Sequence, residues 1–149
     1  MKIIGCGNRD RGDDQAGIVV AERLLALGIA AEIHNGDALA LLERWRRDED
    51  VILVDAVVTG SRCGTLHVWD SGTSGNSLPH VAEPKAVSSH GLDIAKAIEL
   101  GRALGRLPRR LRIYGVEGQR FDRDAAISHE VQTTIDSLVR QIQTELGDR

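Results

Sequence analysis

The chain has few aromatic residues and cysteines and no long apolar run. Aromatic residues are only 3% of its 149 residues, so the core must be built from aliphatic side chains. Cys6 and Cys63 form no CxxC spacing, which argues against a zinc knuckle or redox pair and favours two buried thiols. No apolar run reaches the roughly 18 residues of a membrane span, and the N-terminus has no hydrophobic signal region. We therefore expect a cytoplasmic protein with no membrane partner.

The chain also lacks an excess of positive charge. The formal net charge is -3, and no block of basic residues is interleaved with aromatic ones, which argues against nucleic acid as a partner. The basic segment from Arg106 to Arg112 is more typical of a solvated surface. The length suits one compact core and no linker or repeat divides the chain, so we expect a single domain over residues 1–149.

Short apolar runs alternate with segments of helical spacing. Strands are expected at 2–6, 31–34, 51–56, 64–69 and 110–116, and apolar residues recur at helical spacing over 18–28, 39–45, 92–104 and 127–146. The run 51–56 is the most hydrophobic, as is typical of a central parallel strand. The run 64–69 alternates polar and apolar residues after a short turn, which indicates an antiparallel edge strand.

This order of elements predicts an α/β protein of three layers, α/β/α. Its core is an open five-stranded, mostly parallel sheet with one antiparallel edge strand, between two helical layers. Right-handed crossovers place the first strand beside the third, and ligands of such sheets bind beyond the carboxyl ends of the strands at that switch point. The polar stretch 71–89 predicts a loop long enough to be functional.

A glycine-rich loop follows the first strand and ends in two acids. Its position is that of a dinucleotide fingerprint, but Asp10 stands where the fingerprint has glycine. Asp13 and Asp14 at the helix start would repel a pyrophosphate, so we do not expect a nucleotide. An acid at a helix start is a preferred cap, which accounts for one of the two.

Asp55 and His90 are the other candidates near this edge. A carboxylate ending an apolar strand is costly unless it is hydrogen-bonded, protonated or coordinated to a cation, so either loop amides or a metal shared with the second of the two loop acids would satisfy Asp55. His90 follows two serines that can cap the next helix, and the helix dipole there favours a neutral imidazole. Such an imidazole can bind a metal or accept a proton, although a polar loop residue is the simpler alternative. No serine or cysteine has the surroundings of a nucleophile.

Taken together, these segments resemble the hydrogenase maturation endopeptidases, which process nickel-iron hydrogenase large subunits. The matching residues are Gly5-x-Gly7-Asn8, Gly12-Asp13-Asp14, Gly17, Asp55-Ala56, Ser89-His90, Gly115-Val116-Glu117 and Ser128-x-Glu130-Val131. The resemblance covers nearly the whole chain and implies a three-layer α/β/α domain with one antiparallel edge strand. Gln15-Ala16 and Asn35-Gly36-Asp37-Ala38 depart from the family pattern, which leaves the hydrogenase subgroup open.

The resemblance also implies a substrate and a site. The enzyme would remove the C-terminal extension of a nickel-iron hydrogenase large-subunit precursor once nickel is in place. Asp14, Asp55 and His90 would be the metal ligands and the catalytic residues, binding nickel contributed by the substrate, with no tightly bound metal of the enzyme's own. A metal so held could polarise the scissile carbonyl or activate water.

Two other functions fit the same residues. One is a metal-dependent hydrolase of small amides or esters, which would retain its own metal. The other is a non-catalytic binding module for the hydrogenase precursor, with the segment from Arg106 to Arg112 contacting its partner. The role of Glu117, beyond ending the last predicted strand, stays open at this point.

Overall fold

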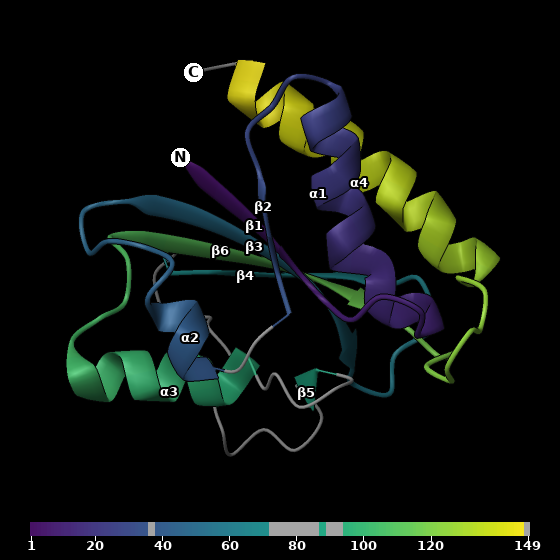
Figure 1. Cartoon of the computed structure of the whole chain (residues 1–149), viewed down its shortest axis with the longest axis horizontal. Coiled ribbons are helices and arrows are strands. Elements are labelled where there is room, and N and C mark those ends of the chain that lie inside the picture. The colour runs from purple at the N-terminus through teal and green to yellow at the C-terminus, as the bar shows by residue number, and fades with distance from the viewer. Residues whose placement is uncertain (36–37, 72–86, 89–93, 148–149) are drawn as a thin grey trace.

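The computed structural model describes residues 1–35, 38–71, 87–88 and 94–147 of the chain, which form one sheet with helices on both faces (Figure 1). The strands are β1 (Lys2–Cys6), β2 (Glu32–His34), β3 (Asp50–Val58), β4 (Leu66–Asp70), β5 (Val87–Ser88) and β6 (Arg110–Glu117). The helices are the 3-10 turn η1 (Gly12–Gln15), α1 (Ala16–Ala26), α2 (Ala38–Leu42), α3 (Ile94–Leu104) and α4 (His129–Gly147).

The strand order is β2-β1-β3-β6-β4, as a doubly wound topology requires. The strands β2, β1, β3 and β6 are parallel, and β4 pairs antiparallel with β6 at the edge. This confirms the mostly parallel sheet, its antiparallel edge strand and the pairing of the first strand with the third. The sheet has one strand more than expected, because β5 pairs antiparallel with the end of β3. That strand falls inside the predicted loop 71–89, of which residues 72–86 and 89 lie outside the described part.

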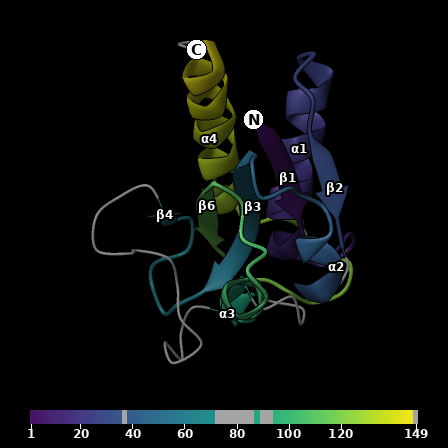
Figure 2. The same cartoon turned by 90° about the vertical axis from the view of Figure 1, so that its left-hand side faces the viewer.

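Two helical layers cover the sheet, which confirms the three-layer arrangement (Figures 1 and 2). Residues alternate along the strands between two cores, because successive side chains of a strand point to opposite faces. On the face of α1 and α4, Ile52 and Val54 pack with Leu24 and Ile135. On the face of α2 and α3, Leu53 and Val57 belong to the core that contains Leu41 and Ile98, whereas Asp55 lies between those two apolar positions.

Two glycines on either side of the loop after β1 allow α1 to pack closely against the sheet. A Cβ on Gly17 would lie 2.2 Å from the carbonyl oxygen of Cys6 and 2.3 Å from that of Val54. A Cβ on Gly5 would lie 2.0 Å from the carbonyl oxygen of Gly17. Only glycine at these two positions lets the start of α1 approach β1 and β3 so closely. As a result, η1 and its acids lie at the carboxyl ends of these strands.

Several predicted boundaries need correction. The second helix ends at Leu42, and Trp45 lies beyond it, buried, with its indole N–H donating to the carbonyl oxygen of Arg106 at 2.8 Å. The last helix begins at His129, two residues later than its apolar pattern. Gly28, at the end of the segment 18–28, has a φ of 81° and forms the glycine cap that follows α1. In the part of the chain that the structure describes, no helix has the length and apolarity to span a membrane.

Candidate functional site

Two acids are buried together at the carboxyl ends of β1 and β3. Asp14 lies in η1 and Asp55 in β3, and both are fully buried. Burial, and next the charge of Asp14, raise the pKa of Asp55 well above its ordinary value, while a hydrogen bond from the backbone N–H of Ala56 opposes the rise. Two of the three predicted site residues therefore share one electrostatic environment. A cation bound beside the two acids would reduce the repulsion between their carboxylates.

The hydrogen bonding of Asp55 is incomplete among the described residues. Its Oδ1 accepts the N–H of Ala56 at 2.9 Å, and its buried Oδ2 has no hydrogen-bond partner in that part of the chain. A set of loop amides was one expected way to satisfy this side chain, but within the described segments only the neighbouring Ala56 contributes. A proton or a cation would complete its bonding. A carboxylate oxygen at this position is a ligand that a divalent metal accepts.

Asp13 has a structural task different from the helix capping that its position suggested. Neither η1 nor α1 has a side-chain cap hydrogen bond. Instead, Oδ2 of Asp13 accepts the N–H groups of Gln119 and Arg120 at 2.8 and 2.9 Å. Ser128, just before α4, donates its N–H to Oδ1 at 2.7 Å and its hydroxyl to Oδ2 at 2.8 Å. Asp13 thus ties the segment after β6 and the start of α4 to η1.

The two cysteines occupy different surroundings. Cys6, at the end of β1, is buried, and burial together with the charge of Asp55 raises the pKa of its thiol well above the usual range. It is the buried thiol that the sequence predicted. Cys63 is only partly buried, so that expectation was wrong for it. Neither cysteine forms a disulfide.

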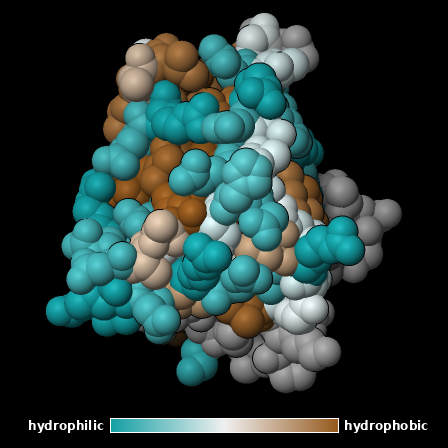
Figure 3. Space-filling model, turned by 90° about the vertical axis from the view of Figure 1, so that its right-hand side faces the viewer, coloured by the Kyte–Doolittle hydropathy of each residue, from teal (hydrophilic) through white to brown (hydrophobic). Residues whose placement is uncertain are grey.

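The third predicted ligand, His90, lies outside the described residues, and so does its expected position at a helix start. Within the described segments, no group of three or more His, Cys, Asp and Glu side chains is arranged to hold a metal ion. What the structure brings together is therefore the two-carboxylate part of the predicted ligand set. Figure 3 faces the side of the molecule toward which β1 and β6 run, where hydrophilic residues cover much of the surface and apolar residues show between them.

A second polar cluster at the same edge was not predicted. Glu117, the last residue of β6, is buried, and its carboxylate accepts the N–H and the hydroxyl of Thr59 at 2.9 and 2.6 Å. Nε2 of His67, on β4, lies 3.1 Å from Oε1 of Glu117. The sequence marks this cluster only by an acid, Glu117, at the end of an apolar strand, as it marks Asp55. The residues that contact Glu117, His67 and Thr59, are 50 and 58 residues away in sequence, so their contact could not be predicted.

The chain is similar to known proteins in both sequence and fold. A family model described as hydrogenase maturation protease matches residues 36–145. The hydrogenase maturating endopeptidase HybD from E. coli has a TM-score of 0.73 and 22% identity, with 99% of this chain and 93% of that chain covered. The NiFe hydrogenase maturation protease HybD from Thermococcus kodakarensis has a TM-score of 0.75 and 19% identity, with 97% and 98% covered.

A third structure, the NiFe hydrogenase maturation protease HycI from Thermococcus kodakarensis KOD1, has a TM-score of 0.63 and 23% identity, with 94% of this chain and 87% of that chain covered. No curated protein matches in a sequence search. At these identities the solved structures establish the fold, and the family model, which spans most of the 149 residues, establishes the family. The chain belongs to the hydrogenase maturation protease family.

Proposed function

We propose that this maturation protease is an endopeptidase that removes the C-terminal extension of a nickel-iron hydrogenase large-subunit precursor after nickel insertion. In this proposal Asp14, Asp55 and His90 bind the nickel of the substrate, which makes the metal a checkpoint for cleavage. The observation that carries it is the pair of fully buried acids at the carboxyl ends of β1 and β3. The buried Oδ2 of Asp55, which no described residue satisfies, is a position at which a cation could replace a proton and complete the bonding.

The chemistry of the ligands supports a divalent metal. Carboxylate oxygens and a neutral imidazole are ordinary ligands of nickel and of other divalent first-row ions. A cation between the acids would offset the burial and the mutual repulsion that raise the pKa of Asp55. Because a metal favours ionised carboxylates, its arrival would also release any proton that the pair shares.

Binding substrate nickel explains why cleavage would depend on maturation. A precursor without nickel offers these acids no cation, so its C-terminal segment is not held at the site. A precursor with nickel is fixed by its metal, and proximity alone lowers the barrier for cleavage of a bond held nearby. The bound metal could in addition polarise the scissile carbonyl.

Paired variants test the assignment. Asp14→Asn and Asp55→Asn, each nearly isosteric with its acid, should show no detectable truncation of a nickel-loaded precursor by intact mass while retaining wild-type circular dichroism. Asp48→Asn is the matched control, because the side chain of Asp48 is 68% exposed and pairs only with Arg46 in the described chain. Normal truncation by folded Asp14→Asn would remove that residue from the site. Such a result in both variants would remove the two acids, and the metal checkpoint built on them, from the mechanism.

A further inference from the structure

His67 lies on the same face of the sheet as Asp55. Asp55 pairs with Gly115 across β3 and β6, and Gly115 pairs with His67 across β6 and β4. Paired residues of neighbouring strands project to the same face, so the two side chains flank a residue that has none. Two strand spacings separate their Cα atoms, about 10 Å. A Cβ on Gly115 would lie 2.8 Å from Cζ3 of Trp69 and 3.0 Å from Cγ1 of Val57. His67 and Asp55 therefore share one face of the sheet, with Trp69 and Val57 packed over the glycine between them.

The neighbours of His67 determine which of its ring nitrogens carries a proton. Nε2 lies 3.1 Å from Oε1 of Glu117 and 3.3 Å from Oγ1 of Thr59. The single hydroxyl proton of Thr59 is donated to Glu117 at 2.6 Å, so Oγ1 can only accept from the imidazole. Both groups near Nε2 are therefore acceptors, and Nε2 is the protonated nitrogen. In the neutral ring Nδ1 then has the free lone pair.

The imidazole is held in this orientation from two sides. Its ring stacks on the indole of Trp69, with centroids 5.6 Å apart and planes 17° apart. Glu117 is fixed in turn, because it is buried and also accepts the backbone N–H of Thr59. The side chain of His67 nevertheless remains 22% exposed. An imidazole whose one N–H is bound to a buried carboxylate, with its other nitrogen available, is the arrangement of a general base and its orienting acid.

We propose that His67 is the general base of precursor cleavage and that Glu117 is the positioning residue that orients it, an inference that rests on the proposed endopeptidase function. Nδ1 of His67 takes a proton from water as the water oxygen bonds to the scissile carbonyl carbon and the carbonyl π electrons move to oxygen. When this intermediate collapses, the C–N bond breaks, and the imidazolium returns the proton to the leaving nitrogen. Water is the only co-reactant, and the products are a carboxylic acid and an amine.

A purely structural role is the alternative reading of the cluster. The backbone of Glu117 also fixes the connection between β3 and β4, donating its N–H to Thr65 and accepting that of Gly64. These backbone bonds do not need the imidazole. A variant that keeps a hydrogen-bond donor toward Glu117 but lacks the basic ring nitrogen therefore distinguishes the structural role of His67 from its role as general base. His67→Gln is such a variant, because its amide NH₂ can reach the carboxylate.

The test compares cleavage of a nickel-loaded precursor by wild type, His67→Gln and the control His129→Gln, whose histidine is exposed at the start of α4. We expect kcat of His67→Gln to fall by about 10²- to 10⁴-fold, as loss of a general base does, with KM and the thermal midpoint close to wild type. Glu117→Gln should lower kcat less, also with little change in KM.

The pH profile adds a readout that a structural role would not move. The dependence of kcat on pH should differ in shape between wild type and His67→Gln, because only the wild-type protein has the basic ring nitrogen. Among the residues that the structure describes, Glu117 from β6 is the charged group in contact with the imidazole, and Asp55 is on the same face two strands away. If wild type does not cleave the precursor, the proposed function fails. If His67→Gln cleaves as wild type does, or differs only by a raised KM, the role of His67 as general base is overturned and the proposed function stands.

Discussion

Asp13 and Asp14 are adjacent in η1, yet their carboxylates face different partners. Asp13 accepts four hydrogen bonds, from Gln119, Arg120 and twice from Ser128. Asp14 is instead close enough to Asp55 for its charge to raise the pKa of that carboxyl. One acid thus holds the loop after β6 and the start of α4 in place, and its neighbour belongs to the candidate site.

This difference predicts opposite effects of replacing the two acids. Asp13→Ala leaves buried donors unpaired and should lower the free energy of unfolding by about 3 kcal/mol or more. Asp14→Asn should change stability far less while removing processing. Urea unfolding of both variants, with intact-mass assay of a nickel-loaded precursor, measures the two effects. A stable, active Asp13→Ala protein would contradict the structural role given to Asp13.

A second prediction concerns the pH dependence of stability. The pKa of Asp55 is raised in the folded protein, by burial and by the charge of Asp14. A carboxyl with a raised pKa contributes stability that is fully present below its unfolded pKa, near 4, and is lost as pH rises through the folded pKa. The free energy of unfolding of wild type should therefore fall, relative to that of Asp55→Asn, from about pH 4 upward.

Urea unfolding of wild type and Asp55→Asn at several pH values, with a chelator present to keep the acids free of metal, checks this trend. The difference between the two proteins cancels contributions from titrating groups that are not coupled to Asp55. A relative gain in wild-type stability with rising pH would mean that Asp55 is stabilised as an anion, contrary to the incomplete hydrogen bonding described above.

The packing of α1 gives a third prediction. Gly17→Ala should destabilise the protein by several kcal/mol, because its Cβ would collide with the carbonyl oxygens of Cys6 and Val54. Gly28→Ala is the control: its Cβ meets no atom within 4 Å, and only the positive φ opposes it, at about 1 kcal/mol. Thermal unfolding of both variants provides the comparison. Equal losses would show that α1 does not approach the sheet as closely as described.

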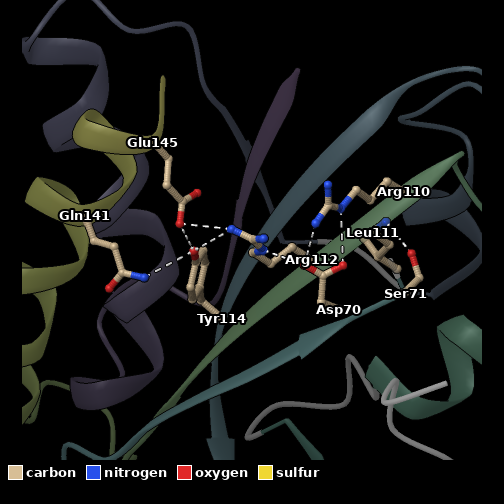
Figure 4. Close-up of polar contacts among 8 residues, drawn as sticks. All are labelled: Asp70, Ser71, Arg110, Leu111, Arg112, Tyr114, Gln141 and Glu145. Carbon is tan, nitrogen blue, oxygen red and sulfur yellow. Dashed lines mark hydrogen bonds and ion pairs between the residues drawn. The ribbon is translucent and has the colours of Figure 1, made fainter. Parts of the chain in front are cut away.

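A fourth prediction uses a polar network toward the beginning of β6 (Figure 4). Arg112 bridges Asp70 on β4 and Glu145 on α4, and the hydroxyl of Tyr114 donates to Glu145 at 2.5 Å. Burial, and then this hydrogen bond, raise the pKa of Tyr114 to about 12. Tyr114→Phe should therefore lower stability by about 1 kcal/mol while leaving precursor cleavage unchanged, since the network lies away from the carboxyl ends of the strands.

The stability loss from Tyr114→Phe should be constant below about pH 10, the ordinary tyrosine pKa, and should shrink as pH rises through the folded value. Denaturant unfolding from pH 7 to about 12 measures it. A Tyr114→Phe protein that is folded but inactive would connect this network with the site and contradict the separation.

Much of the fold could be predicted from local patterns. β1 was predicted at its observed bounds, and the alternation before Trp69 correctly indicated an antiparallel edge strand. β5 could not be predicted, because two residues carry no periodic signal and their pairing with Val57 and Val58 is set by tertiary contacts. The helix with Leu39 and Leu42 ended before Trp45, whose burial requires no helix.

Local patterns also predicted part of the candidate site. Asp55 could be singled out because an acid interrupts an apolar strand, and a parallel sheet brings such strand ends together. The separate tasks of Asp13 and Asp14 could not be read locally, since the partners of Asp13 lie more than 100 residues later. The same holds for His67, which reaches Glu117 only because β4 pairs with β6.

The dependence of cleavage on substrate nickel is the central claim and can be measured directly. Purified protein is incubated with nickel-loaded and nickel-free forms of one hydrogenase large-subunit precursor, and C-terminal truncation is followed by intact mass. The account predicts that only the loaded form is shortened, and that Asp55→Asn shortens neither. Equal truncation of both forms by the wild-type protein would contradict the checkpoint, and the two buried acids would then need another role.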